Sequence, residues 1–278
     1  LKALMPLPNF TFYKADIERQ LPLSDIFRKH KFDAVLHHAA RTGVRHSLQI
    51  PDVYFKTNVL GTLNLFERMR KHNVRKMVLA SSSSLYDGKK MPFTEDQPVN
   101  TPTSPYAVTK KAAEVLAYSY HNLFEIDVSI LRYFTVYGPA GRPDMSYFRF
   151  IKRMDEGQEL ILYGNGRYRR DFTYIDDIVD GTVKALKPLG YEIINLGNNH
   201  PCSMLRLITI IEKALNKQAG ITRMPVQKAD LPATWADISK AKKILGWIPK
   251  VSLEEGIEKT VRWHTENRSL VRRMRTDL

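Results

Sequence analysis

Tyr106 and Lys110 stand four residues apart in the stretch Ser104–Glu114, at the start of a helical pattern. Side chains four residues apart share one face of a helix, with their Cβ atoms about 6 Å apart. A lysine ammonium at that distance stabilises a phenolate and lowers the tyrosine pKa, which makes the tyrosine a usable general base near neutral pH. Ser82, which follows an apolar run upstream, is a candidate for holding the substrate hydroxyl.

The spacing by itself does not establish this chemistry. A tyrosine and a lysine four residues apart occur in many surface helices, so the pair alone favours an ordinary amphipathic helix. The polar strand end at Ser81–Ser84, upstream of this helix in an alternating strand and helix pattern, favours the chemical interpretation instead.

The first half of the chain alternates between strand and helix patterns. Short apolar or alternating runs rich in β-forming residues predict strands, and longer segments of helical period predict helices. The predicted strands are 9–17, 32–40, 75–84 and 127–134, and the predicted helices are 22–31, 51–73 and 106–122. This order indicates a doubly wound α/β fold, a parallel sheet with helices on both faces that binds ligands at the carboxyl ends of its strands.

After Tyr137 the pattern loosens into loops rich in glycine and proline, with short strands and helices. We expect a smaller α/β substrate-binding region there, with 172–198 rejoining the main sheet. The predicted domains are therefore 1–135 with about 171–198, and 136–170 with 199–278.

Composition narrows the possible partners. The 278 residues carry a formal net charge of +14 and include one cysteine, Cys202. Because zinc-finger spacing, aromatic RNA-binding motifs and long basic arms are absent from the sequence, an anionic, phosphate-bearing substrate fits better than nucleic acid.

No apolar run in the sequence approaches the roughly 20 residues of a membrane span. A single cysteine favours a reducing, cytoplasmic setting. The pair His37–His38 lacks further ligands at metal-binding spacing, so we expect no metal site.

Five motifs carry a resemblance to a known family: "ASSSSLYDG", "SPYAVTK", "HHAA", "LRYFTVYGPAGRPD" and "RRDFTYIDDIVDG". They resemble the extended short-chain dehydrogenase/reductase family, and within it the NAD-dependent nucleotide-sugar epimerases and dehydratases, above all the uronic-acid epimerases. The resemblance runs from about residue 9 to the C-terminus. It implies a Rossmann-like sheet, NAD as cofactor, and interconversion of UDP-glucuronate and UDP-galacturonate at C4 through a 4-keto intermediate.

The resemblance also implies a role for each matching residue. Tyr106 is the implied base, Lys110 tunes it and binds the nicotinamide ribose, and Ser82 hydrogen-bonds the reacting oxygen. The residues implied to lie beside NAD are Asp16, Ile17, His38, Ala39, Ala40, Asn58, Ala80, Ser81, Tyr106, Lys110 and Tyr133. Those implied to lie beside the UDP-sugar are Ser83, Ser84, Thr135, Arg142, Arg149, Arg170 and Asp230. Of these, Arg142 is implied to bind the sugar carboxylate, and Arg170 the diphosphate.

The chain departs from the family pattern at its beginning. The family opens on a strand followed by G-x-x-G-x-x-G, whose glycines seat the pyrophosphate at a helix N-terminus, and this sequence has no such motif. It starts at what resembles the third family strand, roughly fifty residues in, judging from the size of a βαβ unit. We therefore expect an N-terminally truncated sheet with an exposed edge, weak NAD binding and poor folding.

Several alternatives stay open. The chain could be another UDP-sugar 4-epimerase, a decarboxylase or a dehydratase, a non-catalytic binding protein, or an inactive truncated fragment. Decarboxylases and dehydratases of this family carry acidic residues beside the catalytic serine or threonine, where Ser83 and Ser84 stand here. Non-catalytic members typically lose the tyrosine or the lysine, and both are present. Family members are usually homodimers, which implies an interface at helices 51–73 and 106–122.

Overall fold

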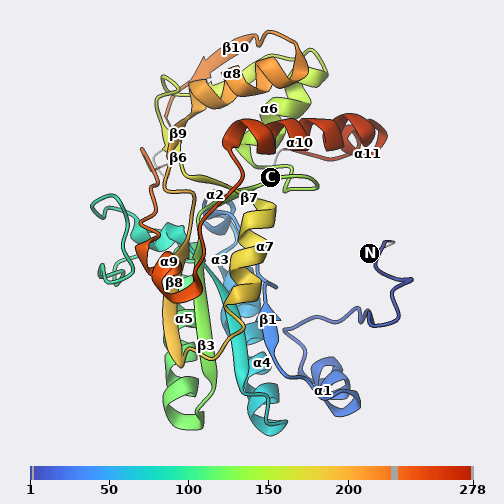
Figure 1. Ribbon diagram of the computed structural model, residues 1–278, viewed down its shortest axis with the longest axis vertical. Coiled ribbons are helices and arrows are strands. Elements are labelled where there is room, and N and C mark those ends of the chain that lie inside the picture. The colour runs from blue at the N-terminus through green and yellow to red at the C-terminus, as the bar shows by residue number, and fades with distance from the viewer. Residues whose placement is uncertain (2, 227–230, 277–278) are drawn as a thin grey trace.

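The computed structural model describes residues 1, 3–226 and 231–276. Its main sheet has four parallel strands, in the order β1-β2-β3-β8 (Figure 1). These are β1 (Val35–His37), β2 (Lys76–Ser82), β3 (Asp127–Tyr133) and β8 (Tyr191–Leu196). The near-continuous apolar runs of β2 and β3 are typical of parallel strands buried on both faces.

Helices cover both faces of the sheet, so the doubly wound prediction is confirmed. Met77 and Leu79 of β2 pack in one core with α1 (Gln20–Lys29), α4 (Gly61–Lys71) and α5 (Pro105–Phe124). Val78, between them, points to the opposite core, with α7 (Ile175–Lys184) and α9 (Ser239–Leu245). This alternation follows from the two-residue period of a strand.

The predicted helix 51–73 is continuous but changes its winding. It consists of α3 (Pro51–Phe55), a π-helical turn η1 (Lys56–Leu60) and α4. Gly61 at the end of the π-helical turn allows a close approach, because a Cβ there would lie 2.6 Å from Cδ1 of Ile17. Single π-helical turns inside α-helices occur often at functional sites, and this one carries Asn58.

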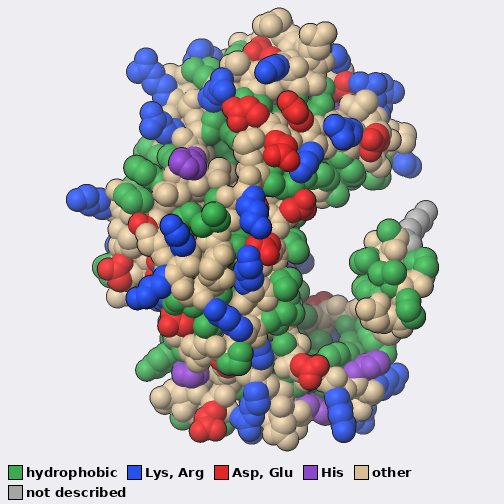
Figure 2. All heavy atoms as spheres, viewed as in Figure 1, with side chains coloured by type: hydrophobic (Ala, Val, Ile, Leu, Met, Phe, Trp, Pro, Cys, Tyr) green, Lys and Arg blue, Asp and Glu red, His purple; other side chains and the backbone are tan. Residues whose placement is uncertain are grey.

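The prediction of a strand at 9–17 is wrong. In the described ranges no strand pairs with the outer edge of β1, and β-forming residues make a strand only where a neighbour completes the ladder. Leu36 of β1 is accordingly 43% exposed. The N-terminal end of the described chain extends away from the body of the molecule, and Figure 2 shows it as a separate lobe rich in hydrophobic side chains. The Tyr13 hydroxyl and His30 Nε2 are hydrogen-bonded at 2.6 Å.

The rest of the chain forms a second, mixed region. Its helices are α6 (Ser146–Asp155), α8 (Met204–Leu215), α10 (Leu253–Glu266) and α11 (Arg268–Arg272), whereas the short α2 (Val44–Ser47) follows β1 and contacts α5. Its strands pair as β4 (Thr135–Tyr137) with β7 (Phe172–Tyr174), β5 (Leu160–Tyr163) with β10 (Ile221–Met224), and β6 (Arg169–Arg170) with β9 (Cys202–Ser203). The helices α6, α8 and α10 share a core of their own. The domain boundaries stay a prediction.

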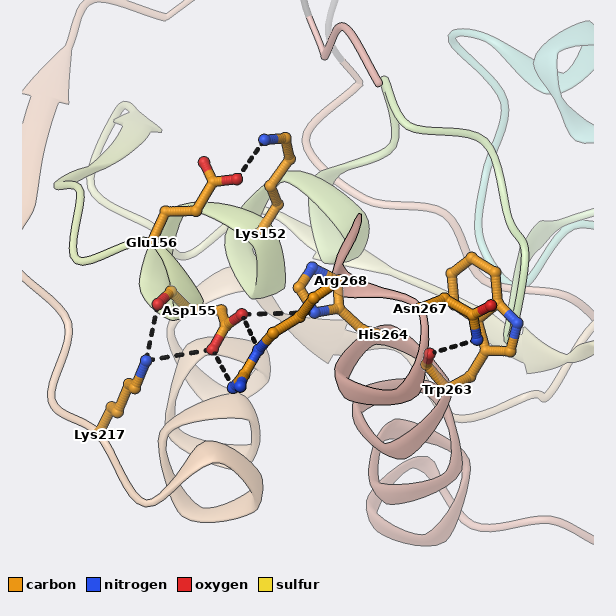
Figure 3. A network of polar contacts seen from close by, with 8 residues as sticks. All are labelled: Lys152, Asp155, Glu156, Lys217, Trp263, His264, Asn267 and Arg268. Atoms are coloured by element: carbon orange, nitrogen blue, oxygen red, sulfur yellow. Dashed lines mark hydrogen bonds and ion pairs between the residues drawn. The ribbon is translucent and has the colours of Figure 1, made fainter. Parts of the chain in front are cut away.

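Asp155, the last residue of α6, ties the C-terminal helices together (Figure 3). Its nearly buried carboxylate accepts two hydrogen bonds from Arg268 at 2.8 Å and one from Lys217 at 3.1 Å. His264 of α10 lies 3.8 Å from the same carboxylate. Three separate segments are thus fixed against α6, which forms one wall of the candidate site.

None of the helices in the described ranges is long and apolar enough to cross a membrane.

Candidate active site

A cavity of about 860 Å³ opens where the strands of the main sheet end. Its floor is formed by residues that follow β1, β2 and β3, and its opposite wall by α6 and β5 of the second region. In a doubly wound sheet, this carboxyl edge is where ligands bind.

Tyr106 and Ser82 meet at this cavity, as the sequence predicts. The helix α5 begins with Ser104 as N-cap, whose hydroxyl accepts from the amide of Ala107 at 3.2 Å, and Pro105 follows in the first turn. That start turns Tyr106 toward the end of β2, where its hydroxyl is hydrogen-bonded to the Ser82 side chain. One turn later, Lys110 Nζ donates to the carbonyl of Ala80 at 2.8 Å.

Burial dominates the acid–base behaviour of this group. It raises the pKa of Tyr106 above the ordinary value of 10.0, and the Ser82 hydrogen bond and the charge of Arg142 offset part of this rise. It lowers the pKa of Lys110 to about 8, against the attraction of Glu114. The sequence-based expectation that Lys110 lowers the pKa of Tyr106 is therefore wrong for the protein without ligands. The ammonium faces a backbone carbonyl, and desolvation is the larger effect.

The residues predicted to lie beside NAD fall into two groups. Tyr106, Tyr133 and Ala40 line the cavity. Near them, His38 Nε2 and the Tyr133 hydroxyl are hydrogen-bonded at 3.0 Å, and exposed Ala39 follows His38. The strand end contributes Ala80 through its carbonyl and Ser81 through a hydroxyl that donates to Glu114 at 2.7 Å.

The other residues of that set, Asn58, Asp16 and Ile17 among them, are not part of the cavity lining. Asn58 is buried and links two segments of the chain. Its side-chain nitrogen donates to Thr109 Oγ1 at 2.9 Å, and its side-chain oxygen accepts from the Arg41 backbone N–H at 2.7 Å. Asp16 and Ile17 precede α1, where Asp16 accepts from the amide of Glu18 and Ile17 packs into the core. Their proposed contact with the cofactor stays a prediction.

The predicted substrate-binding residues converge on the cavity, apart from one. Ser83, Ser84, Thr135, Arg142, Arg149 and Arg170 all line it. The Ser84 hydroxyl is buried and has no hydrogen-bond partner in the described part of the chain. The Arg170 guanidinium donates to the carbonyl of Leu231 at 2.8 Å. Asp230 lies outside the described residues.

Arg142 is held in place by its own loop. Its Nε donates to Asp144 at 3.0 Å, Nη2 also reaches the Asp144 carboxylate, and Nη1 donates to the Thr42 hydroxyl. Gly141 is required beside it, because a Cβ at that position would lie 1.7 Å from the hydroxyl of Tyr147. The Arg142 guanidinium thus already forms a bidentate ion pair with the Asp144 carboxylate. The same fork of N–H donors suits a carboxylate on a substrate.

Positive charge dominates the cavity lining. Five arginines line it, and the one carboxylate among the described lining residues is Asp144; the arginines are Arg41, Arg45, Arg142, Arg149 and Arg170. Arg45 lies 4.9 Å from the ring centre of Tyr163 and links α2 to β5. Sequence reasoning missed Arg41, Arg45 and Asp144. Their proximity to "HHAA" and to Arg142 could have indicated them, because residues just after a strand end lie at the binding edge. The described residues contain no metal-binding cluster.

The doubly wound sheet with a ligand cavity at its carboxyl edge defines the chain as a Rossmann-like α/β protein. The model of the GDP-mannose 4,6 dehydratase family matches residues 3–260, and the chain belongs to that family. The predicted resemblance to NAD-dependent epimerases and dehydratases is thereby confirmed.

Three similar proteins are 4-epimerases of UDP-sugars. The chain is 53% identical over 273 residues to a UDP-glucuronate 4-epimerase of Thermodesulfobacterium geofontis, a match that covers 98% of this chain and 84% of the relative. The solved UDP-glucuronic acid 4-epimerase of Bacillus cereus, in complex with UDP-glucuronic acid and NAD, is 38% identical with a TM-score of 0.88, over 95% of this chain and 84% of that one. The UDP-glucose 4-epimerase of Thermotoga maritima with UDP-glucose is 31% identical with a TM-score of 0.89, over 93% and 85%.

Proposed function

We propose that the chain is an NAD-dependent epimerase that interconverts UDP-glucuronate and UDP-galacturonate at C4. The observation that carries the proposal is the meeting of Ser82 and Tyr106 with a buried, unpartnered Ser84 hydroxyl and five arginines around one cavity. A UDP-uronate carries a diphosphate and a carboxylate, which matches an excess of guanidinium groups. The similar epimerases support the same assignment.

The residues around Lys110 fit the nicotinamide half of NAD. The ammonium has three N–H donors, and Ala80 is its one hydrogen-bond acceptor in the described part of the chain. The remaining donors suit ribose hydroxyls, and the small side chains of Ala39 and Ala40 leave room for a ring to approach. Bound there, NAD would supply reversible hydride transfer at C4 of the sugar.

The protein's own groups handle the proton and the orientation of the sugar. Tyr106 takes the proton of the 4-hydroxyl and later returns it, and Ser82 holds the reacting oxygen by a hydrogen bond. We assign the sugar carboxylate to Arg142 with Ser83, Ser84 and Thr135. We assign the diphosphate to Arg170 with Arg149. Ser83 and Ser84 offer no carboxylate beside Ser82, which argues against dehydration and decarboxylation.

Two finer assignments belong to the same proposal. We place the enzyme in the cytoplasm, because the single cysteine suits a reducing compartment. We also propose a homodimer, because α5 exposes Val115, Tyr118 and Leu123 by 53%, 54% and 67%, with Phe55 and Leu60 exposed on the preceding helix. Sedimentation of the wild type and of Leu123→Glu tests the dimer, and an unchanged sedimentation profile would exclude this surface.

A product assay tests the activity. The purified chain is incubated with UDP-glucuronate and NAD, and UDP-galacturonate is separated from UDP-xylose by anion exchange. We expect UDP-galacturonate without net formation of NADH. UDP-xylose or a dehydrated sugar would replace the epimerase assignment with the corresponding family activity. Calorimetric titration with NAD, with UDP-glucuronate present, shows separately whether the cofactor binds, and absence of binding by the folded chain would overturn the proposal for this chain.

A further inference from the structure

Three successive turns of α5 contact three successive residues of β2. Tyr106 is hydrogen-bonded to the Ser82 side chain, and Lys110 Nζ donates to the Ala80 carbonyl at 2.8 Å. The third contact comes from Glu114, whose Oε1 accepts from the Ser81 hydroxyl at 2.7 Å. The proposed reaction accounts for the first two contacts and leaves the third without a role.

Glu114 is fully buried and carries a second, stronger partner. Arg132 of β3 donates to both carboxylate oxygens, from Nε at 2.9 Å and from Nη2 at 2.8 Å. Both side chains are 1% exposed. Arg132 also donates to the hydroxyl of Tyr86 at 2.7 Å, and that hydroxyl donates to Asn195 of β8 at 2.8 Å. A chain of polar contacts thus runs from α5 through β3 to β8 directly beneath the site.

A buried ion pair such as Glu114–Arg132 contributes little net stability. The desolvation of two buried charges can exceed their mutual attraction, and apolar replacements of similar volume are often neutral or stabilising. Its geometry, by contrast, is exacting: a bidentate pair fixes α5 against β3, and the Ser81 contact fixes the strand end on which Ser82 and Ala80 stand. Its position, one helical turn beyond Lys110, also brings a negative charge to the lysine face of the helix.

We propose that Glu114 is a positioning residue for the reaction: it seats the end of β2 against α5 and holds the ammonium charge of Lys110 in place. The inference rests on the proposed function and adds a residue to it. Glu114 acts through Ser81 and Lys110 and does not line the cavity. Burial pulls the Lys110 pKa down and Glu114 opposes that pull, which agrees with the proposal.

The groups facing Lys110 come from three elements. His37, the last residue of β1, and His38, which follows it, interact electrostatically with Lys110, and the carbonyl of Ala80 comes from β2. Burial lowers the pKa of His37 to about 3, so that ring stays neutral across the working range. Glu114 is the anionic group that raises the Lys110 pKa against the effect of burial. Replacing Glu114 should therefore lower the Lys110 pKa.

The first test measures Lys110 itself and needs no catalysis. The wild-type chain is labelled with ¹³Cε-lysine, the Lys110 signal is assigned by its absence from Lys110→Arg, and its chemical shift is followed with pH. We expect Glu114→Gln to lower the Lys110 pKa by about 1 unit, because an attractive charge is removed. Lys111→Met is the control, because it removes a cation 3.7 Å from Glu114 and leaves the anion in place, so it should not lower the Lys110 pKa.

A paired variant guards against misfolding. Glu114→Gln alone leaves Arg132 buried without its counter-charge, whereas Glu114→Gln with Arg132→Met removes both charges. We expect the double variant to melt close to the wild type and to show a smaller lowering of the Lys110 pKa than Glu114→Gln, because the repulsive charge of Arg132 is removed as well. An unchanged Lys110 pKa in both variants, folded, would reduce Glu114 to a packing role and overturn the proposal.

The second test separates positioning from the activity itself. With UDP-glucuronate and NAD, the double variant should lose kcat with little change in KM, and the alkaline limb of its pH–rate profile should move to lower pH by the shift seen for Lys110. A wild type without turnover would contradict the proposed function and leave the lysine titration to decide on Glu114. An active double variant with an unmoved alkaline limb would contradict the role of Glu114 alone.

Discussion

Replacing Arg142 tests which substrate the cavity is built for. In the structure its guanidinium is bound by Asp144 and by the Thr42 hydroxyl, at the rim of the cavity. We expect Arg142→Met to impair turnover of UDP-glucuronate and to spare UDP-glucose, because only the former carries a carboxylate for the guanidinium to pair with.

The magnitude follows from the exposure of the pair. A hydrogen bond to a charged group contributes about 1.5–3 kcal/mol. The Arg142 side chain is 42% exposed and solvent screens it, so we take about 2 kcal/mol for the whole contact with the substrate carboxylate. At about 1.4 kcal/mol per factor of ten, this corresponds to a loss of roughly 30-fold in kcat/KM.

The assay compares kcat/KM for UDP-glucuronate and UDP-glucose in the wild type and in Arg142→Met. Arg206→Met is the matched control, because Arg206 pairs with Glu254 at 2.8 Å on the surface and does not line the cavity. A similar loss with both substrates would mean that Arg142 supports the loop and not the carboxylate, and the uronate assignment would lose its main support.

Three further predictions address the base, the core and the second region. Tyr106→Phe should lower kcat by about 10²–10⁴-fold with a nearly unchanged melting temperature, and retained turnover would mean that another group is the base. His37 has a folded-state pKa near 3, below its unfolded value of 6.5, so the unfolded chain binds the extra proton and stability falls as pH drops below 6.5. Between pH 6.5 and 4.5 this costs about 2–3 kcal/mol, a loss that denaturant titration should find in the wild type and not in His37→Gln. Asp155→Asn should destabilise the protein by about 1–2 kcal/mol, because Arg268 and Lys217 lose their shared anion, and an unchanged denaturation midpoint would mean that solvent already screens the cluster.

The sheet was predictable from sequence because its strands are buried on both faces. The apolar runs of β2 and β3 can be satisfied only between two layers of helices, so the pattern leaves one architecture. The segment 9–17 has an equally good strand composition, yet it lacks a neighbouring strand, and composition cannot supply one. Local pattern therefore predicts burial well and predicts pairing only where a partner strand is at hand.

The site was predictable to the extent that its residues stand next to a strand end or a helix start. Ser82 and Tyr106 satisfy that condition, and the structure brings them together. Glu114 lies in the middle of α5, and its contact with Arg132 depends on how α5 lies across β3, which no spacing along the chain encodes. Asp144 was missed for another reason, because its role is to hold Arg142 in place. In a sequence, an arginine and an aspartate two residues apart in a loop give no sign that they pair at a binding site.

The order of ionisation in the site leads to a last prediction. Burial raises the pKa of Tyr106 above 10.0 and lowers that of Lys110 to about 8, so in the free protein the lysine loses its proton before the tyrosine does. A tyrosine in that state is no base near neutral pH, so additional positive charge near Tyr106 must come with the ligands. We therefore expect the phenolate absorbance of the wild type minus that of Tyr106→Phe to show no ionisation below pH 10 without ligands. A difference signal near neutral pH in the free chain would instead mean that Lys110 already activates Tyr106, and that the spacing of the two residues along the helix is sufficient after all.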